Sequence, residues 1–405
     1  MRQRCKGIWK PIPPRSIANA LFLRIYRTNT ITIIRQFHYN AAPVKYYAAP
    51  VLCMVVAVGI LLGSYWMWLG FAVLVSVVVV GDAVFPDDNN RYEPRNNLIF
   101  EIPLYMALPL TAVLLTTVAW SWCQNPNDLY VVIYFLRLVS DYDFVGARNG
   151  NEAWDHIGAL LGGALIVAGY ATTVAHELIH RTNNKWAVIQ GRLLLSVSCN
   201  PDFSIEHVYG HHALVGMRED PATARYGENV YKFFIRSLFM GHFSAWQLEL
   251  RRLHQGGSTW WTFDNRMLTG YLMCITIVTL FYFAASWPGV LAFITQALLA
   301  KFILEVVNYM EHYGLERKPG ASVAPEHSWN TNKYVSSAVL FSLTRHSAHH
   351  EQPRTRFWEL NPYESAPQMP YGYLTTLGIC LIPPLWFRTI HPRLEKLRQN
   401  CVDVG

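Results

Sequence analysis

The amino-acid sequence predicts an all-α integral membrane protein with six transmembrane helices and a helical, histidine-rich portion on the cytoplasmic side. Three observations predict this class. Of the 405 residues, 52% are hydrophobic and 15% are charged, whereas a soluble domain has about 25% charged residues. Four segments lack any charged residue over lengths that suit membrane spans. Nine of the fifteen histidines fall in four short clusters outside those segments.

The uncharged segments are residues 46–81, 102–127, 157–175 and 267–300, which contain 36, 26, 19 and 34 residues. A helix needs about 20 apolar residues to cross a bilayer, whereas an uninterrupted apolar run of about 14 is typical of a buried helix. The first and last segments are therefore too long for one span and suit two each. Each has a break near its middle, "GSYW" at 63–66 and "SWPG" at 286–289, where Gly and Pro favour turns. The sequence thus predicts six spans, arranged as three hairpins.

The distribution of charge orients the predicted spans. The chain has no Asp or Glu before Asp82, but it has nine Lys or Arg there, which predicts a cytoplasmic N-terminal tail. The loop at 127–156 carries five acidic and two basic residues, as expected of a loop on the outer side of the membrane. We therefore expect a bacterial inner-membrane protein. A mitochondrial membrane is the alternative, because residues 1–40 are rich in Arg and free of acidic residues, like a presequence.

The sequence predicts one membrane domain at 46–390, between a basic tail or targeting segment at 1–45 and a C-terminal tail at 391–405. The seven cysteines include no Cys-x-x-Cys pair, so neither structural zinc nor a rubredoxin-type iron centre is expected. The net charge of +7 is explained by topology, and we find no motif for binding nucleic acid.

The histidine clusters have helical spacing and fall on one side of the membrane. They are "HELIH" (His176, His180), "EHVYGHH" (His207, His211, His212), "NYMEHYGL" (His312) and "RHSAHH" (His346, His349, His350). A helix over 157–180 would be ~36 Å long, which exceeds the ~30 Å hydrocarbon core. His176 and His180 then lie just beyond the core, one turn apart. His207 and His211 repeat that spacing, and His346 has it with His349 or His350.

These clusters predict a site for two metal ions. Neutral imidazole binds iron, copper and zinc, whereas a zinc protease needs only three protein ligands. Nine imidazoles shared by two ions give four or five each and leave positions open for oxygen, which suits a pair of iron ions. The remaining six histidines are isolated, and we expect packing or hydrogen-bonding roles for them: His38, His156, His242, His254, His327 and His391.

Several motifs together resemble the membrane-bound alkane 1-monooxygenases and their relatives the xylene monooxygenases. They are "HELIHR", "EHVYGHH", "NYMEHYGLER", "LTRHSAHH", "REDPATARYGEN", "HSWN" and "ESAPQMPYGY". The resemblance covers residues 50–390 and implies a non-haem di-iron oxygenase that hydroxylates the terminal carbon of an apolar hydrocarbon, with the nine clustered histidines as iron ligands. "GSYWMWLG" and "TRFWELNP" resemble the xylene branch, whereas "RHSAHH" and "HSWN" resemble the alkane branch. The substrate therefore stays open between an n-alkane and an alkyl aromatic.

The resemblance also implies partners. The chain has no motif for flavin, haem or a thiolate-bound cluster, so electrons must come from a rubredoxin or ferredoxin with its reductase. The other partners are O2, a hydrocarbon that dissolves in membrane lipid, and the lipid itself. Carboxylates next to the clusters are expected to accept hydrogen bonds from ligand imidazoles, namely Glu177, Glu206, Glu311 and Glu351. For Glu351, a solvated charge at a helix end is the alternative.

The first hairpin leaves one hypothesis about substrate length. If a substrate channel runs along the bundle, Trp66 or Trp68 closes its far end. The alternative is that these residues are anchors at the membrane interface, where Trp is enriched.

Three other classes compete with the hydroxylase. A fatty-acid desaturase or hydroxylase would use similar irons on an acyl chain. An intramembrane zinc protease needs a further ligand, often an aspartate in another span, and the predicted spans contain none. A metal transporter would carry its ligands inside the spans, whereas these histidines cluster beyond them.

Overall fold

The computed structural model describes residues 42–402, apart from residue 95 and residues 124–133, 135–136 and 139. The chain divides into two compact units, Met1–Lys45 and Tyr46–Gly405, and the following description concerns the second. Most of the expected targeting segment, with His38, lies outside the described residues. The described chain contains helices and two isolated β-bridges but no strand, so the predicted all-α class is confirmed.

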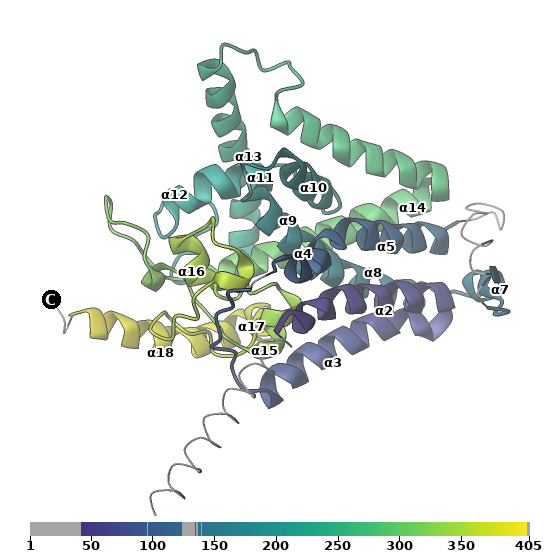
Figure 1. Ribbon diagram of the computed structural model, residues 1–405, viewed down its shortest axis with the longest axis horizontal. Coiled ribbons are helices and arrows are strands. Elements are labelled where there is room, and N and C mark those ends of the chain that lie inside the picture. The colour runs from purple at the N-terminus through teal and green to yellow at the C-terminus, as the bar shows by residue number, and fades with distance from the viewer. Residues whose placement is uncertain (1–41, 95, 124–133, 135–136, 139, 403–405) are drawn as a thin grey trace, which may run out of the picture. The chain divides into compact units, whose positions relative to one another are not determined.

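The apolar helices form a bundle in which α2, α3, α5 and α8 lie next to one another (Figure 1). The helical elements of this part are η1 (Ala42–Tyr47), α2 (Ala48–Leu62), η2 (Ser64–Trp68), α3 (Leu69–Val84), α4 (Leu98–Tyr105), α5 (Ala107–Ser121), α7 (Phe144–Asn149), α8 (Ala153–Ile166), η3 (Val167–Ala171), α9 (Thr172–Ile179) and α14 (Arg266–His312). Among the described residues, five continuous helices are long and apolar enough to cross a membrane.

Both breaks predicted from the sequence are present in the structure. Helix α14 has 47 residues, but Ala285 and Ser286 are not helical, and Ser286 has a φ of +53°. The helix therefore turns back on itself at the predicted "SWPG" break (Figure 1). The first hairpin turns at Gly63, where φ is +68° and an added Cβ would lie 2.9 Å from Asn151 Oδ1. By length and composition, the described helices thus include the five to six candidate spans of the predicted membrane class.

The fourth span is one helix from Ala153 to Ile179, formed by α8, η3 and α9. His180 caps it with helical backbone angles, so the expected continuation to His180 is confirmed. The π-helical turn η3, at Val167–Ala171, was not expected from the sequence. The third span has a break at Met106 between α4 and α5, and residues 124–127 of the predicted segment lie outside the described residues.

Glycines let helix α8 pack very closely against its neighbours. A Cβ on Gly158 would lie 2.6 Å from Trp68, and one on Gly162 would lie 3.2 Å from the backbone nitrogen of Phe71. A Cβ on Gly163 would overlap the side-chain amide of Gln296. The sequence "GALLGGALIVAG" therefore brings α8 into contact with α3 on one side and α14 on the other.

The other helices gather at one end of the bundle, and α13 runs across its direction (Figure 1). They are α10 (Lys185–Ser196), α11 (Phe203–Glu206), η4 (His207–His211), α12 (His212–Leu214), α13 (Val230–Gln255), η5 (Pro325–His327), α15 (Tyr334–Val339), α16 (His346–Glu351), η6 (Phe357–Glu359), α17 (Tyr373–Cys380) and α18 (Pro383–Val402). Helices α17 and α18 are bent by 119° and together also meet the length and apolarity test for a span.

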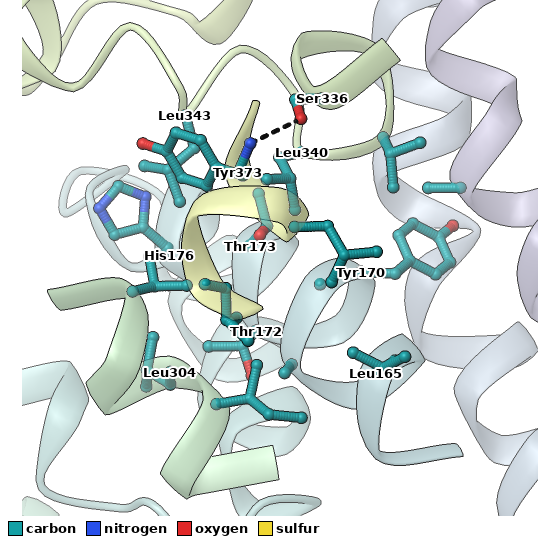
Figure 2. Close-up of a pocket in the computed structure, with 18 of the residues that line it drawn as sticks. Leu165, Tyr170, Thr172, Thr173, His176, Leu304, Ser336, Leu340, Leu343 and Tyr373 are labelled. Carbon is teal, nitrogen blue, oxygen red and sulfur yellow. Dashed lines mark hydrogen bonds between the residues drawn. The ribbon is translucent and has the colours of Figure 1, made fainter. Parts of the chain in front are cut away.

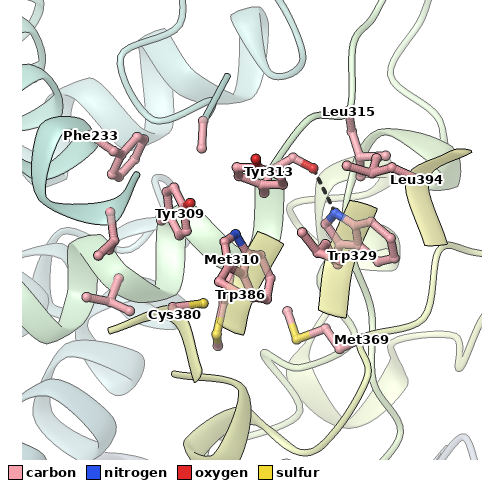
Figure 3. Packing of buried hydrophobic residues seen from close by; sticks show 14 of the residues in the cluster. Phe233, Tyr309, Met310, Tyr313, Leu315, Trp329, Met369, Cys380, Trp386 and Leu394 are labelled. Carbon is pink, nitrogen blue, oxygen red and sulfur yellow. Dashed lines mark hydrogen bonds between the residues drawn. The ribbon is translucent and has the colours of Figure 1, made fainter. Parts of the chain in front are cut away.

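A core of large side chains holds the C-terminal helices against the end of α14 (Figure 3). Trp386 of α18 packs with Tyr309 and Tyr313, which flank His312, and the indole N–H of Trp329 donates to the Tyr313 carbonyl at 3.0 Å. The core also includes Leu394, so α18 continues without a break through the boundary expected at residue 391. This packing fixes the segment that carries His312.

Candidate metal centre

The nine predicted ligand histidines converge in two neighbouring groups, which are the ones found among the described residues. Within each group the available ring nitrogens lie within 4.8 Å of one another. The first group contains His176, His180, His207, His212 and His349, and the second contains His211, His312, His346 and His350. The rings of His212 and His350 lie 4.5 Å apart, centroid to centroid, so the groups adjoin.

A π-helical turn divides the second histidine cluster between the groups. The sequence predicts that His207 and His211, four residues apart, share one helix face. Instead η4 aligns residues five apart, as π-helical geometry does. The Nε2 atom of His207 lies 3.2 Å from that of His212, and His211 belongs to the other group. The one-turn spacing of His207 and His211 therefore does not bring them into one group, because the wider turn places His207 beside His212 instead.

The fourth cluster is shared in the same way by helix α16. His346 and His350 are one turn apart, and their Nε2 atoms lie 2.9 Å from each other in the second group. His349 faces the first group, with its Nε2 3.0 Å from that of His212. His312, at the end of α14, lies 3.1 Å from His346 by the same atoms. The α16 helix thus supplies ligands to both groups.

The inner nitrogens have the spacing of ligands around a metal ion. Neighbouring Nε2 atoms lie 2.9–3.2 Å apart. Imidazole–metal bonds of about 2.1 Å at right angles place two nitrogens about 3 Å apart. The Nε2 atoms of His176 and His180 are buried without a hydrogen-bond partner in the described structure, which a native protein rarely tolerates. The residues therefore fit two cations, one in each group.

For the ligand histidines that lie outside the membrane spans, burial keeps the imidazole in its neutral, metal-binding form. Burial, assisted by His211, lowers the pKa of His180 to about 3. Burial and the neighbouring histidines also lower the pKa of other ligands well below its usual range: His207, His212, His346, His349 and His350. A neutral imidazole offers its lone pair to a cation without first losing a proton. The centre is therefore ready to bind metal at neutral pH.

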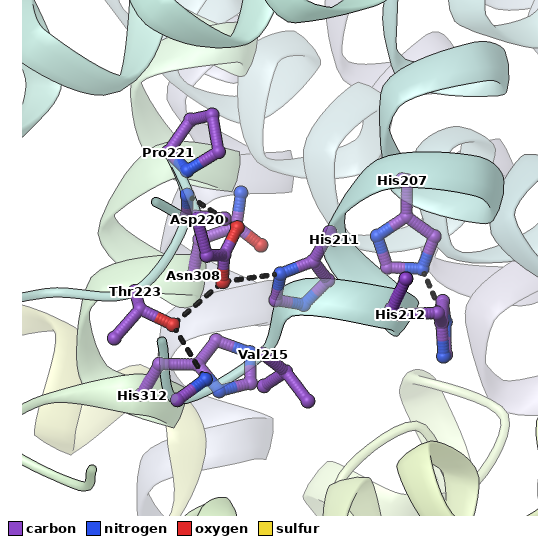
Figure 4. A network of polar contacts seen from close by, with 12 residues as sticks. His207, His211, His212, Val215, Asp220, Pro221, Thr223, Asn308 and His312 are labelled. Atoms are coloured by element: carbon purple, nitrogen blue, oxygen red, sulfur yellow. Dashed lines mark hydrogen bonds and ion pairs between the residues drawn. The ribbon is translucent and has the colours of Figure 1, made fainter. Parts of the chain in front are cut away.

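Asp220 is a functional residue that the sequence reasoning missed (Figure 4). Its Oδ2 lies 2.9 Å from Nδ1 of His211 and accepts from the Thr223 hydroxyl at 2.6 Å. Burial favours the neutral carboxyl, but His211 and these hydrogen bonds lower the pKa of Asp220. A carboxylate behind a ligand histidine fixes its ring and tautomer. The "REDPATARYGEN" motif contains Asp220, but its sequence position does not reveal this contact.

The carboxylates that were expected to contact the ligands mostly do not. Glu177 accepts from Arg181, Glu206 has one buried oxygen without a partner, and Glu351 accepts from Tyr363. Of these four carboxylates, only Glu311 contacts a ligand histidine in the described structure. Its Oε2 lies 3.3 Å from Nε2 of His346, the nitrogen that faces the metal position, and not from an outer N–H of the ring. The expectation is therefore wrong for Glu177 and Glu206, whereas Glu351 is exposed at the end of α16, as the alternative of a solvated charge predicts.

An apolar cavity of about 90 Å³ lies beside both histidine groups (Figure 2). Helices α3, α8, α9, α14 and α17 contribute to its walls. His176 and His207 of the first group line it, as does His346 of the second. At this end the Tyr373 hydroxyl donates to Glu311 at 2.7 Å. The cavity can thus place an apolar molecule against both groups at once.

Neither tryptophan of the first hairpin lines this cavity. The indole N–H of Trp68 donates to the Trp154 carbonyl at 3.1 Å, and its ring packs against Gly158. Trp66 is exposed, and its ring lies 4.9 Å from that of Tyr65, centroid to centroid, in a tilted arrangement. The structure therefore contradicts the hypothesis that either residue closes the cavity, because close packing of α8 on α3 separates them from it.

A polar cavity reaches His180, another ligand of the first group. Arg181, Arg354 and Arg356 line it. Arg181 is paired with Glu101 at 2.6 Å and with Glu177 at 3.0 Å, whereas Arg356 lies 3.9 Å from Glu177. The lining therefore has an excess of positive charge next to the metal centre.

The isolated histidines have other partners. In the described part of the chain none belongs to either group. His156 stacks on Trp122, and His242 and His391 hydrogen-bond tyrosine hydroxyls.

Helix α3 also extends far enough to include Asp82, so the expectation that no span contains an aspartate is wrong. Asp82 accepts from Ser336 and belongs to neither group.

Comparison with known proteins agrees with this site. The fatty acid desaturase family model matches residues 153–391. Alkane 1-monooxygenase 2 of Pseudomonas aeruginosa is 32% identical over 343 residues, which cover 82% of this chain and 84% of that protein. The chain belongs to the alkane 1-monooxygenase family. Alkane 1-monooxygenase 2 of Alcanivorax borkumensis is 29% identical over 93% of this chain and 96% of its own length. The hydroxylase component of the Pseudomonas putida xylene/toluene monooxygenase is 28% identical over 89% and 91%.

Membership in the alkane 1-monooxygenase family confirms the resemblance drawn from the motifs. The chain is an oxidoreductase of this kind, within the wider fatty acid desaturase family. It is also a multi-pass membrane protein with a histidine-rich metal site. Both branches that the motifs pointed to are among its relatives, so similarity alone leaves the substrate open.

Proposed function

We propose that this protein is a non-haem di-iron monooxygenase that hydroxylates the terminal methyl group of an apolar hydrocarbon, either an n-alkane or an alkyl aromatic such as xylene. One oxygen atom of O2 enters the C–H bond, and the other is reduced to water by two electrons and two protons. The observation that carries this proposal is the apolar cavity that ends against ligand histidines of both groups.

The histidines have the first role in this proposal. Two iron ions bind to His176, His180, His207, His212 and His349 and to His211, His312, His346 and His350. Iron is favoured over zinc because the relatives are named monooxygenases, and imidazole is a good ligand for iron. When bound, the iron ions supply the activation of O2. Asp220 holds His211 in place, and Glu311 keeps a carboxylate at the metal end of the cavity.

The cavity walls have the second role. An alkyl chain offers no polar group for recognition, so the walls must hold it by shape and exclude water. The end of the chain then lies against His176, His207 and His346. Terminal selectivity follows from this positioning, because reaction rates depend strongly on how the reacting atoms are held.

The electron donor is a rubredoxin or ferredoxin with its reductase. The polar cavity at His180 supports this part of the proposal, because it joins a metal ligand to the surface and is lined by arginines. An acidic redox protein complements that charge. We also propose that the metal centre faces the cytoplasm of a bacterial inner membrane. The mitochondrial alternative depends on residues 1–40, which lie outside the described residues.

A fatty-acid desaturase or hydroxylase is the second candidate, because the matching family model is that of the desaturases. Metal analysis and product identification decide between them. The purified protein alone should contain about two irons per chain. Together with its electron donor, it should convert octane or a xylene to the terminal alcohol. One zinc without iron would contradict the proposal, and a double bond introduced into a fatty acyl substrate would favour the desaturase.

A further inference from the structure

We propose that a buried polar route through Glu305 on α14 carries protons from the surface at His242 to the metal centre. The inference rests on the proposed function, because hydroxylation reduces one oxygen atom of O2 to water and so consumes two protons in each turnover. Protons move between hydrogen-bonded groups and water molecules, so they need a polar route that reaches the substrate cavity.

A second polar cavity, the small cavity, has a volume of about 20 Å³ and adjoins the apolar cavity. Phe203, His207 and Asn308 line both of them. The polar cavity at His180, in contrast, shares no lining residue with the apolar cavity. The small cavity therefore brings polar groups directly to the space where the reaction consumes protons.

The small cavity has the volume and the partners to hold a water molecule. About 10–15 Å³ is enough for one water, provided that polar groups surround it. Oε1 of Glu206 and Nδ2 of Asn200 are buried, and neither has a hydrogen-bond partner in the described structure. Both residues line the small cavity, as do Asp202 and Glu305. A water molecule bound there would satisfy the two free atoms and link Asp202 to Glu305.

Glu305 connects the small cavity with the apolar cavity. Its side chain is buried and lines the small cavity. The Ser237 hydroxyl donates to its Oε2 at 2.6 Å, and the Asn308 amide donates to the same oxygen at 3.4 Å. Neither partner belongs to the two histidine groups. Because Asn308 also lines the apolar cavity, a proton released by Glu305 needs only a water molecule at Asn308 to reach the space beside the metal ligands.

The outer end of the route is at Asp202 and His242. Asp202 lines the small cavity, and its Oδ1 lies 3.7 Å from Nδ1 of His242 on α13. The side chain of His242 is 42% exposed, so it exchanges protons with bulk water, as imidazole does near neutral pH. Oδ2 of Asp202 lies 3.5 Å from Nζ of Lys301. The route thus runs from His242 through Asp202 and the small cavity to Glu305.

The charges around the small cavity favour a stored proton. Asp202, Glu206 and Glu305 line it, and the described structure places the ammonium group of Lys301 among them. Asp220 adds a further negative charge near Glu206. Buried carboxylates that lie close together do not all ionise, so this group keeps a proton available. The carboxyl group of Glu305 gives a proton to water at the apolar cavity and regains one from the small cavity, so it ends each turnover unchanged.

The test removes the proton carrier and keeps its size. Glu305→Gln cannot release a proton. With octane or a xylene and a reduced electron donor, we expect kcat to fall at least about tenfold, since positioned proton donors typically contribute about 10²–10⁴-fold. The KM for the hydrocarbon should stay the same, because Glu305 does not line the apolar cavity. The solvent isotope effect on kcat, measured in H2O and D2O, should rise because proton transfer becomes rate-limiting.

A second variant and a control separate this effect from a loss of folding. Ser237→Ala keeps the Glu305 carboxyl group but removes the hydroxyl that holds it, so it should also raise the solvent isotope effect. Glu249→Gln is the matched control, because Glu249 is another buried carboxylate that bonds to α14 but lines neither cavity. At a temperature where this control is folded, its kcat and isotope effect should equal those of wild type. Iron content should be the same in all preparations.

Unchanged kcat and solvent isotope effect in Glu305→Gln, with full iron content, would overturn the route. If that variant does not fold, an unchanged isotope effect in Ser237→Ala has the same meaning. An equal rise in Glu249→Gln would also contradict the proposal. A wild type that forms a double bond instead of an alcohol would count against the proposed function alone, because a desaturase consumes the same two protons and the same variants then test the route.

Discussion

Removing a single ligand histidine should empty the metal position to which it belongs. His312 offers the clearest test of this expectation. It is buried and belongs to the second group, where its Nε2 lies 3.1 Å from that of His346. We expect His312→Ala to lower the iron content from about two to about one per chain and hydroxylation below detection. Metal analysis of the purified variant, together with octane turnover, measures both effects.

The control for this change is His391→Ala. His391 hydrogen-bonds the Tyr313 hydroxyl and belongs to neither group, so this variant should keep both irons. Full iron content and activity in His312→Ala would show that His312 only packs in the core.

Asp220 should act on the metal through His211. Its carboxylate holds the outer nitrogen of that ring at 2.9 Å, and both side chains are buried. Partners behind a ligand histidine typically contribute about 10–100-fold to metal affinity. We therefore expect Asp220→Asn to weaken binding of the second metal by that factor, measured by competition with a chelator. Asp264→Asn is the control, because Asp264 is exposed and lies in a loop; equal chelator sensitivity of the two variants would contradict the role.

At the scale of elements, two π-helical turns shape the centre. The η3 turn lies in the fourth span just before His176, and η4 carries His207 and His211. A π turn is costly in an ordinary helix and tends to occur at functional sites. In η4 it places His211 in the second group, whereas His207 and His212 belong to the first.

The junction between α13 and α14 depends on one buried carboxylate. Glu249 accepts hydrogen bonds from the side chains of Arg252 and Arg266 and from the Arg266 backbone. Burial alone would raise the pKa of Glu249, but these hydrogen bonds together lower it to about 2. Glu249→Gln keeps the shape and removes the charge, so it should destabilise the fold by on the order of 2 kcal/mol at neutral pH.

The sign of the pH dependence follows from the lowered pKa of Glu249. An ordinary glutamate titrates near 4.5, so the unfolded chain takes up a proton first as the pH falls. The stabilisation is therefore complete above pH 4.5 and is lost as the pH falls toward about 2. Melting temperatures of wild type and Glu249→Gln should differ most at pH 7 and converge below pH 4.5. A constant difference across this range would show that the charge of Glu249 is not the cause.

At the scale of the whole molecule, the metal centre lies between two unlike cavities. The apolar cavity touches ligands of both groups, and the polar cavity touches His180. Under the proposed function, substrate and electrons would approach the same centre by separate routes.

The polar cavity predicts how the electron donor is recognised. Replacing both Arg354 and Arg356 with Glu reverses two positive charges at its rim. We expect the KM for a reduced rubredoxin or ferredoxin to rise about tenfold and its salt dependence to weaken, because rim charges mainly steer association. Steady-state kinetics with varied donor concentration and salt measure this.

The matched control for the donor site is Arg393→Glu, an exposed arginine on α18 that does not line the polar cavity. A chemical reductant supplied in place of the protein donor should work equally well in all variants. An unchanged KM in the double variant would move the docking site elsewhere.

The local pattern of residues along the sequence determined the fold class, the membrane crossings and the histidine clusters of this protein. Uncharged runs of 19 to 36 residues are long enough to cross a bilayer, and Gly63 and Ser286 stand where the chain turns. The four clusters were recognisable because ligands one turn apart leave a local spacing. These features depend on neighbours in the sequence, which is why they could be predicted without a structure.

Tertiary structure alone decided how the histidines are shared, which carboxylate supports them and which side chains line the apolar cavity. His211 and Asp220 meet across a loop, and His346 meets Glu311 from a distant helix. The π turn at His207 widens a helix without a signature that we could read from the sequence. Helix α8 touches α3 and α14 closely at Gly162 and Gly163. Such contacts join residues far apart in the chain, and packing of whole helices selects them.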